Sequence, residues 1–115
     1  MGKVLQIRVI AVTWNDDLIE EYWPRVAQLA FSVPIKLANR GVLEMVRALE
    51  EGLEFAKWPE ARKNALGPGI RKCAQIRADL EKALADWKPE QANQLSNQLE
   101  DALDELERAF ARAGE

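Results

Sequence analysis

Two pairs of carboxylates stand one helical turn apart, Asp16 with Glu20 and Asp17 with Glu21. Side chains four residues apart share one face of a helix, so either pair could hold a hard cation weakly. Asn15, immediately before them, is a typical helix N-cap, and acidic side chains are stabilising in a first turn. We therefore interpret these acids as the start of a helix and predict no metal site.

The single cysteine, Cys73, is the one candidate thiol nucleophile, and Arg71 and Lys72 precede it. Neighbouring cations can lower a thiol pKa. However, the sequence contains no histidine, which excludes Ser-His-Asp and Cys-His catalysis, zinc sites built with histidine and haem held by a proximal histidine. Cys73 also falls on an apolar stripe, so we interpret it as a buried small hydrophobe. We predict no catalytic residue and no cofactor.

A possible anion site follows the run Gly67-Pro68-Gly69, where Arg71 and Lys72 come shortly after three breaker residues. Helix N-termini bind anions through their free N–H groups. The run lacks the spacing of a phosphate-binding P-loop, and no strand pattern precedes it. We interpret it as a loop that joins two helices.

Aromatic residues beside helix stops predict a different kind of site. Trp23 precedes Pro24, and Trp87 is followed by Lys88-Pro89. In a helical bundle such rings are expected to close the ends of the core. The alternative is a ligand pocket at one end of the bundle. Its candidate lining residues are Arg8, Tyr22, Trp23 and Trp87.

The elements that must position these residues are visible as two apolar stripes near the C-terminal end. Their members are spaced alternately three and four residues apart, which places them on one face of a helix. Each stripe therefore predicts an amphipathic helix that packs against another helix. The stripes are Cys73, Ile76, Leu80, Ala83 and Trp87, and then Leu95, Leu99, Ala102, Leu106 and Ala109.

Proline and glycine runs divide the chain into segments of similar length. Ser32 is a suitable N-cap for the second segment, and Pro34 suits its first turn. We predict an all-α protein, an antiparallel up-and-down four-helix bundle that forms a single domain over 1–115. In that arrangement Trp87 should lie near Phe31, and Trp58 near Phe110. The predicted helices cover 4–31, 34–57, 69–87 and 89–112, with a short extra helix near 59–66.

The N-terminal segment allows two interpretations. Residues 4–13 are rich in β-branched side chains, as strands are, but no second strand candidate could pair with them. A helix kinked by Pro24 is favoured, and a strand that pairs with a second copy is the alternative. Both interpretations place apolar surface or open backbone at a subunit interface, and the alternative is that the apolar side chains pack under the loop at 57–69 within one chain. The candidate interface residues are Ile7, Ile10 and Trp14.

Composition bounds the function. The 115 residues carry a net charge of −3, and no basic stripe is present, so nucleic acid is an unlikely partner. No apolar run approaches the length of a membrane span, and we expect a cytoplasmic protein. We predict a non-enzymatic helical protein–protein interaction module that self-associates as a homodimer. The alternative is a small-molecule-binding bundle, or an enzyme, with an end pocket lined by Trp, Tyr and Arg8.

Overall fold

The computed structural model describes residues 11–13, 15–33 and 41–112. Within these ranges the protein is helical and no residue belongs to a strand, so the all-α prediction is confirmed. The molecule is elongated, with principal extents of 52 × 27 × 25 Å. The helices are α1 (Asp17–Tyr22), α2 (Pro24–Phe31), α3 (Val42–Phe55), α4 (Glu60–Ala85) and α5 (Pro89–Arg112).

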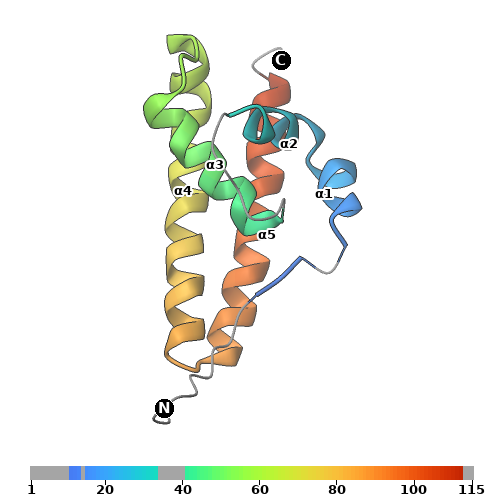
Figure 1. Ribbon diagram of the computed structural model, residues 1–115, viewed down its shortest axis with the longest axis vertical. Helices are drawn as coiled ribbons and strands as arrows, with labels where there is room; N and C mark the ends of the chain where they lie inside the picture. The colour runs from blue at the N-terminus through green and yellow to red at the C-terminus, as the bar shows by residue number, and fades with distance from the viewer. Residues whose placement is uncertain (1–10, 14, 34–40, 113–115) are drawn as a thin grey trace.

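Helices α4 and α5 form a long antiparallel hairpin that runs the length of the molecule (Figure 1). Apart from Trp87, the residues of the predicted stripes are buried or half-buried in it: Leu80 is 3% exposed and Leu99 is 2% exposed. Leu103 and Phe110, which were not on the predicted stripe, are buried as well. The apolar periodicity therefore identified the main packing surface and missed part of its width.

The predicted loop at 67–69 is wrong, and the helix predicted near 59–66 is present but not separate, because α4 begins at Glu60 and continues through Pro68. A proline inside a helix costs about 3 kcal/mol. Leu66 and Ile70 flank it at 1% exposure each, and burying two such side chains contributes about 3–6 kcal/mol. Gly69 lets α5 come close, since a Cβ there would lie 2.9 Å from Leu106 Cδ1. The free energy gained by burying these side chains therefore offsets the cost of a proline inside the helix.

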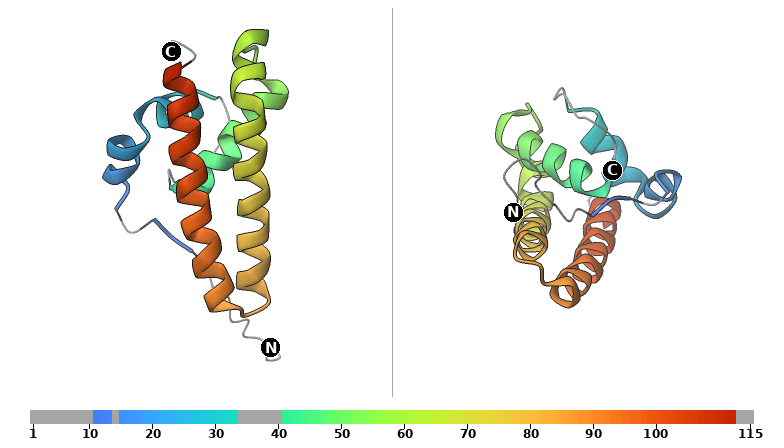
Figure 2. Two further views of the ribbon diagram at one scale, coloured as in Figure 1. Left: turned by 180° about the vertical axis from the view of Figure 1, so that it is seen from behind. Right: turned by 60° about the horizontal axis from the view of Figure 1, so that its bottom comes forward.

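The other three helices are short and lie on one side of the hairpin (Figure 2). Helix α3 packs against α4, and α2 packs against both α3 and α5. One cluster of buried apolar residues includes members of all five helices. The predicted arrangement of four antiparallel helices of similar length is not found in the described part of the chain, because the first two predicted helices are shorter and broken.

The predicted helix over 4–31 is wrong where it can be compared, since residues 11–13 have no regular structure and the helix breaks at Trp23. Trp23 has φ −132° and ψ 60°, outside the helical region. Pro24 therefore begins α2 at its first turn, where its missing N–H costs nothing, and does not kink a longer helix. Residues 4–10 lie outside the described part of the chain.

The predicted helix over 34–57 is shorter where it can be compared, since α3 starts at Val42, directly after Gly41 in an extended conformation. The predicted start at Pro34, and with it the predicted capping role of Ser32, lies outside the described residues. Ser32 follows the last residue of α2, and its hydroxyl donates to the Leu29 carbonyl at 2.7 Å.

The predicted neighbours of Trp87 are wrong. Trp87 lies in the turn between α4 and α5, at the end of the hairpin far from α2 and Phe31 (Figures 1 and 2). Its side chain is 61% exposed and closes no end of the core. The up-and-down arrangement that placed it beside Phe31 is not found among the described residues. Trp58 packs on the core beside Gly52 of α3, and its predicted proximity to Phe110 stays a prediction.

Candidate binding pocket

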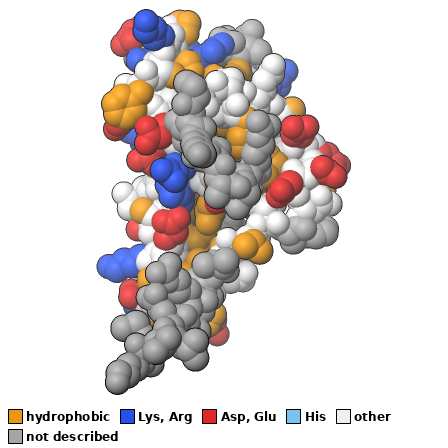
Figure 3. All heavy atoms as spheres, in the orientation of Figure 1, with side chains coloured by type: hydrophobic (Ala, Val, Ile, Leu, Met, Phe, Trp, Pro, Cys, Tyr) orange, Lys and Arg blue, Asp and Glu red, His pale blue; other side chains and the backbone are white. Residues whose placement is uncertain are grey.

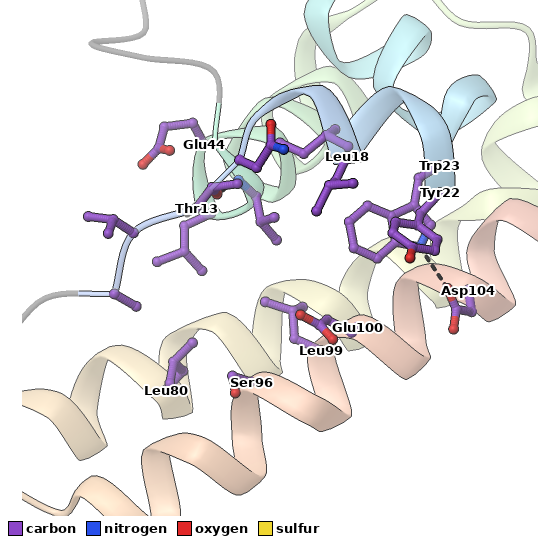
Figure 4. A pocket seen from close by; sticks show the side chains of 16 residues that line it. Thr13, Leu18, Tyr22, Trp23, Glu44, Leu80, Ser96, Leu99, Glu100 and Asp104 are labelled. Carbon is purple, nitrogen blue, oxygen red and sulfur yellow. Dashed lines mark hydrogen bonds between the residues drawn. The ribbon is translucent and has the colours of Figure 1, made fainter.

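A pocket of about 540 Å³ lies between residues 11–13, residues 15–23 and the start of α3 on one side and the α4–α5 hairpin on the other (Figure 4). Residues 11–13 and α1 form one wall, the start of α3 forms the second, and α4 and α5 form the floor. Leu18 and Thr13 face Leu99 and Glu100 across the open space. The lining residues are Ala11, Val12, Thr13, Asn15, Leu18, Ile19, Tyr22, Trp23, Val42, Leu43, Glu44, Leu80, Ser96, Leu99, Glu100 and Asp104.

The wall formed by residues 11–13 is fixed to the start of α3 by one hydrogen bond. The backbone N–H of Val42 donates to Thr13 Oγ1 at 2.8 Å. The backbone N–H of the preceding residue, Gly41, donates to Glu44 Oε1 at 3.1 Å. The first turn of a helix leaves its N–H groups without partners in the helix, and side-chain oxygens satisfy them. Thr13 is thus a capping residue supplied from a different segment.

The aromatic wall is fixed to α5 in a similar way. The Trp23 indole N–H donates to Asp104 Oδ1 at 2.8 Å. One turn further along α5, Glu107 Oε1 accepts the backbone N–H groups of Arg25 and Val26, each at 3.0 Å. The Arg25 guanidinium also lies 3.5 Å from Glu107 Oε2. Helix α5 therefore caps α2 and holds Trp23 in place.

Helix α1 begins at Asp17 with Asp16 at the N-cap position, one residue after the predicted N-cap Asn15, and the Asp16 side chain makes no capping hydrogen bond. The Asn15 side-chain oxygen accepts the Asp17 N–H at 3.1 Å, and Asp17 and Glu20 lie in the first turn. The four acidic residues of this region are exposed, and acidic side chains gather over α1 in the space-filling view (Figure 3). Within the described part of the chain, no three acidic or cysteine side chains come together in a metal-binding group.

The pocket contains two of the four predicted ligand-binding residues. Tyr22 is 60% exposed at its rim and Trp23 is 6% exposed in its wall, with ring centroids 6.1 Å apart and planes tilted by 48°. Trp87 is not among the lining residues, because it lies at the far turn of the hairpin. Arg8 lies outside the described residues. So do the predicted interface residues Ile7, Ile10 and Trp14.

Sequence reasoning missed the polar residues that α5 supplies to the floor. Ser96, Glu100 and Asp104 line the pocket from successive turns of one helix. Their spacing of four residues was visible in the sequence and places them on one face. This spacing did not indicate a site, because a row of acidic residues on an amphipathic helix is ordinarily a solvated surface.

The thiol of Cys73 does not belong to this pocket. It is fully buried in the hairpin, as predicted. Burial in apolar surroundings raises its pKa from an ordinary value of 9.0 to about 11, despite the nearby charge of Lys72. The thiol is therefore protonated at neutral pH and is shielded from reagents, which is the opposite of a catalytic cysteine.

Comparison with known proteins adds no family: no family model matches this chain, and no curated sequence or solved structure is significantly similar to it. Among the described helices, none has the length and apolar character needed to cross a membrane.

Proposed function

We propose that this protein is a non-enzymatic helical interaction module that associates with a second copy of itself. The observation that supports this proposal best is the pair of exposed apolar side chains at the pocket rim. Val12 is 76% exposed and Tyr22 is 60% exposed, and both line the pocket. Exposed apolar surface that is continuous with a pocket is typical of a place where a partner binds.

The sequence next to this rim extends the same apolar character. Val12 is separated by one residue from Ile10, and Ile7 lies three residues before that. A self-complementary surface on one chain is most often closed by a two-fold dimer. The expected assembly is therefore a homodimer whose interface includes the rim residues and the N-terminal sequence.

The test is sedimentation velocity at micromolar concentration, and the wild-type protein should sediment as a dimer. Tyr22→Glu and Ile10→Glu, made separately, should each dissociate it with the helical content retained. The matched control is Phe55→Glu, because Phe55 is 75% exposed at the end of α3, away from the pocket. A monomeric wild-type protein, or equal loss of the dimer in the control, would contradict the proposal.

A second candidate function, binding of a small molecule, is favoured by the pocket itself. Its volume of about 540 Å³ falls within the range of about 300–1,000 Å³ that ligand sites occupy. Most of its lining is apolar, with a few polar side chains among them, as ligand sites commonly are. Thermal-shift screening of the purified protein with a small-molecule collection tests this candidate.

A further inference from the structure

The side chains that line the pocket define which ligands it can accept. Leu18, Leu43 and Leu80 supply apolar surface from three different helices, and Val12 and Val42 extend it. Burial of an apolar ligand surface there removes it from water, which contributes about 25 cal/mol of binding free energy per Å² of surface buried. The ligand should therefore carry a compact apolar group.

The charged groups of the pocket are all of one sign among its described lining residues. Glu44, Glu100 and Asp104 contribute carboxylates, and no lysine or arginine is present in that lining. Asp104 and Glu44 already accept hydrogen bonds from Trp23 and Gly41. The Glu100 carboxylate makes no hydrogen bond or ion pair with the described residues. Its carboxylate lies beside Leu99 on the pocket floor and is available to a ligand (Figure 4).

The aromatic wall adds to the same preference. The negative faces of tyrosine and tryptophan rings attract cations that come within about 6 Å. The ring centroids of Tyr22 and Trp23 lie 6.1 Å apart. Both residues line the pocket, so two aromatic rings border the same space. The Trp23 ring is fixed by Asp104, and its orientation does not depend on the ligand.

From these features we infer that the pocket binds an organic cation, a protonated amine attached to a compact apolar body. The ammonium group would lie near Glu100, and the apolar body would contact the leucines of α1, α3 and α4. An anionic ligand of the same shape would be repelled by three carboxylates. This inference rests on the second candidate function, small-molecule binding.

The experiment compares three probes that share one apolar cage: adamantylmethylamine, adamantylmethanol and adamantanecarboxylate. Affinities are measured by titration calorimetry at low salt, and the site is located by amide chemical shifts in nuclear magnetic resonance. We expect the amine to bind about tenfold more tightly than the alcohol, because it can form a charge-assisted hydrogen bond. The carboxylate should bind most weakly, and shift changes should centre on Leu18, Leu43 and Ser96.

The variant Glu100→Gln should weaken amine binding about threefold, as expected for one partly solvated ion pair, and leave alcohol binding unchanged. Asp101→Asn is the matched control, because Asp101 is the next residue of α5, is exposed and does not line the pocket. Its amine affinity should stay at the wild-type value. Melting curves of both variants establish that the fold is retained.

The outcomes separate the inference from the function on which it rests. If the alcohol or the carboxylate binds at the pocket as tightly as the amine, the charge preference is wrong and the small-molecule site remains. Equal weakening of amine binding by both variants would also overturn the role of Glu100. If none of the three probes binds in the millimolar range, both the inference and the second candidate function fail.

Discussion

The α4–α5 hairpin and the three-helix layer packed on it share one apolar core, but the layer also depends on polar contacts from elsewhere in the chain. The hairpin helices have 26 and 24 residues, and repeated apolar side chains along their length hold them together. The layer helices have 6, 8 and 14 residues. Isolated helices shorter than about 12–15 residues are marginal in water, so α1 and α2 depend on contacts from elsewhere in the chain.

Besides the apolar contacts with the shared core, these contacts include a small number of specific hydrogen bonds. Helix α2 receives its cap from Glu107, and Trp23 is held by Asp104, in each case from more than eighty residues further along the chain. The start of α3 is capped by Thr13. The hairpin therefore relies on buried apolar side chains, and the layer relies on individual polar partners as well as on the shared core. The pocket lies where the layer meets the hairpin.

The hairpin should show the largest response to loss of a core side chain. Leu103 is completely buried, so Leu103→Ala should lower the free energy of unfolding by about 2–5 kcal/mol through lost burial and the cavity left behind. Leu95→Ala, at a half-buried position of the same helix, is the control and should cost clearly less. Urea melts measure both. Equal losses of unfolding free energy in the two variants would contradict the difference in burial between Leu103 and Leu95.

A second test of the hairpin uses pH. Because burial raises the pKa of Cys73 to about 11, the unfolded thiol ionises before the folded one. Its contribution to stability is fully present below pH 9 and is lost as the pH rises towards 11, by about 2–3 kcal/mol. Cys73→Ala removes this titration. The difference in unfolding free energy between the wild-type protein and Cys73→Ala should therefore become smaller by that amount between pH 8 and 11. A constant difference between them would mean that the thiol is not buried.

The sequence identified those parts of the molecule that depend on local periodicity. The stripe through Ile76 and Leu80 and the burial of Cys73 follow from residue spacing alone, and the structure confirms them. The continuity of α4 through Pro68 did not follow, because it depends on how closely α5 approaches at Gly69. Local signals for a break were outweighed there by burial.

The candidate site was less predictable than the hairpin, for a related reason. Tyr22 and Trp23 were found because aromatic rings beside a proline are conspicuous in a sequence. Glu107 and Thr13 act through backbone N–H groups of remote segments, and no residue pattern within either segment indicates such a partner. Pairings of this kind become visible only when the fold brings the segments together.

Two glycines allow the layer and the hairpin to be compared directly. A Cβ at Gly52 would lie 2.4 Å from the rigid ring of Trp58, whereas a Cβ at Gly69 would meet the flexible end of Leu106 at 2.9 Å. Gly52→Ala should therefore cost about 2 kcal/mol through overpacking. Gly69→Ala should be close to neutral, since helix propensity returns about 1 kcal/mol. Thermal melts measure both, and the reverse order would contradict this packing of Trp58.

The cap from α5 to α2 should have a smaller and more local effect. Glu107→Ala leaves the N–H groups of Arg25 and Val26 without an acceptor, and loss of an N-cap costs about 1–2 kcal/mol. Glu105→Ala is the control, because Glu105 forms only an exposed pair with Lys72 at 3.4 Å and should cost less than about 0.5 kcal/mol. Amide hydrogen exchange should accelerate in α2 and not in α4. Uniform acceleration would mean that the layer and the hairpin unfold together.

The smallest effect is expected at the turn of the hairpin, where Trp87 has φ 58°. Two hydrogen bonds close this helix end, from the Lys88 N–H to the Ala83 carbonyl at 2.9 Å and from the Trp87 N–H to the Leu84 carbonyl at 3.2 Å. This pattern normally places glycine in the left-handed position, because a Cβ there costs about 1–2 kcal/mol.

Comparison of Trp87→Gly with Trp87→Ala separates this backbone strain from loss of the indole ring, since both variants lose the ring and only alanine keeps a Cβ. The glycine variant should be more stable by about 1 kcal/mol in urea melts, opposite to the order of the two residues inside a helix. If alanine were the more stable, the turn would not require a left-handed residue. The layer should be unaffected in either variant, because Trp87 lies at the end of the hairpin far from α2.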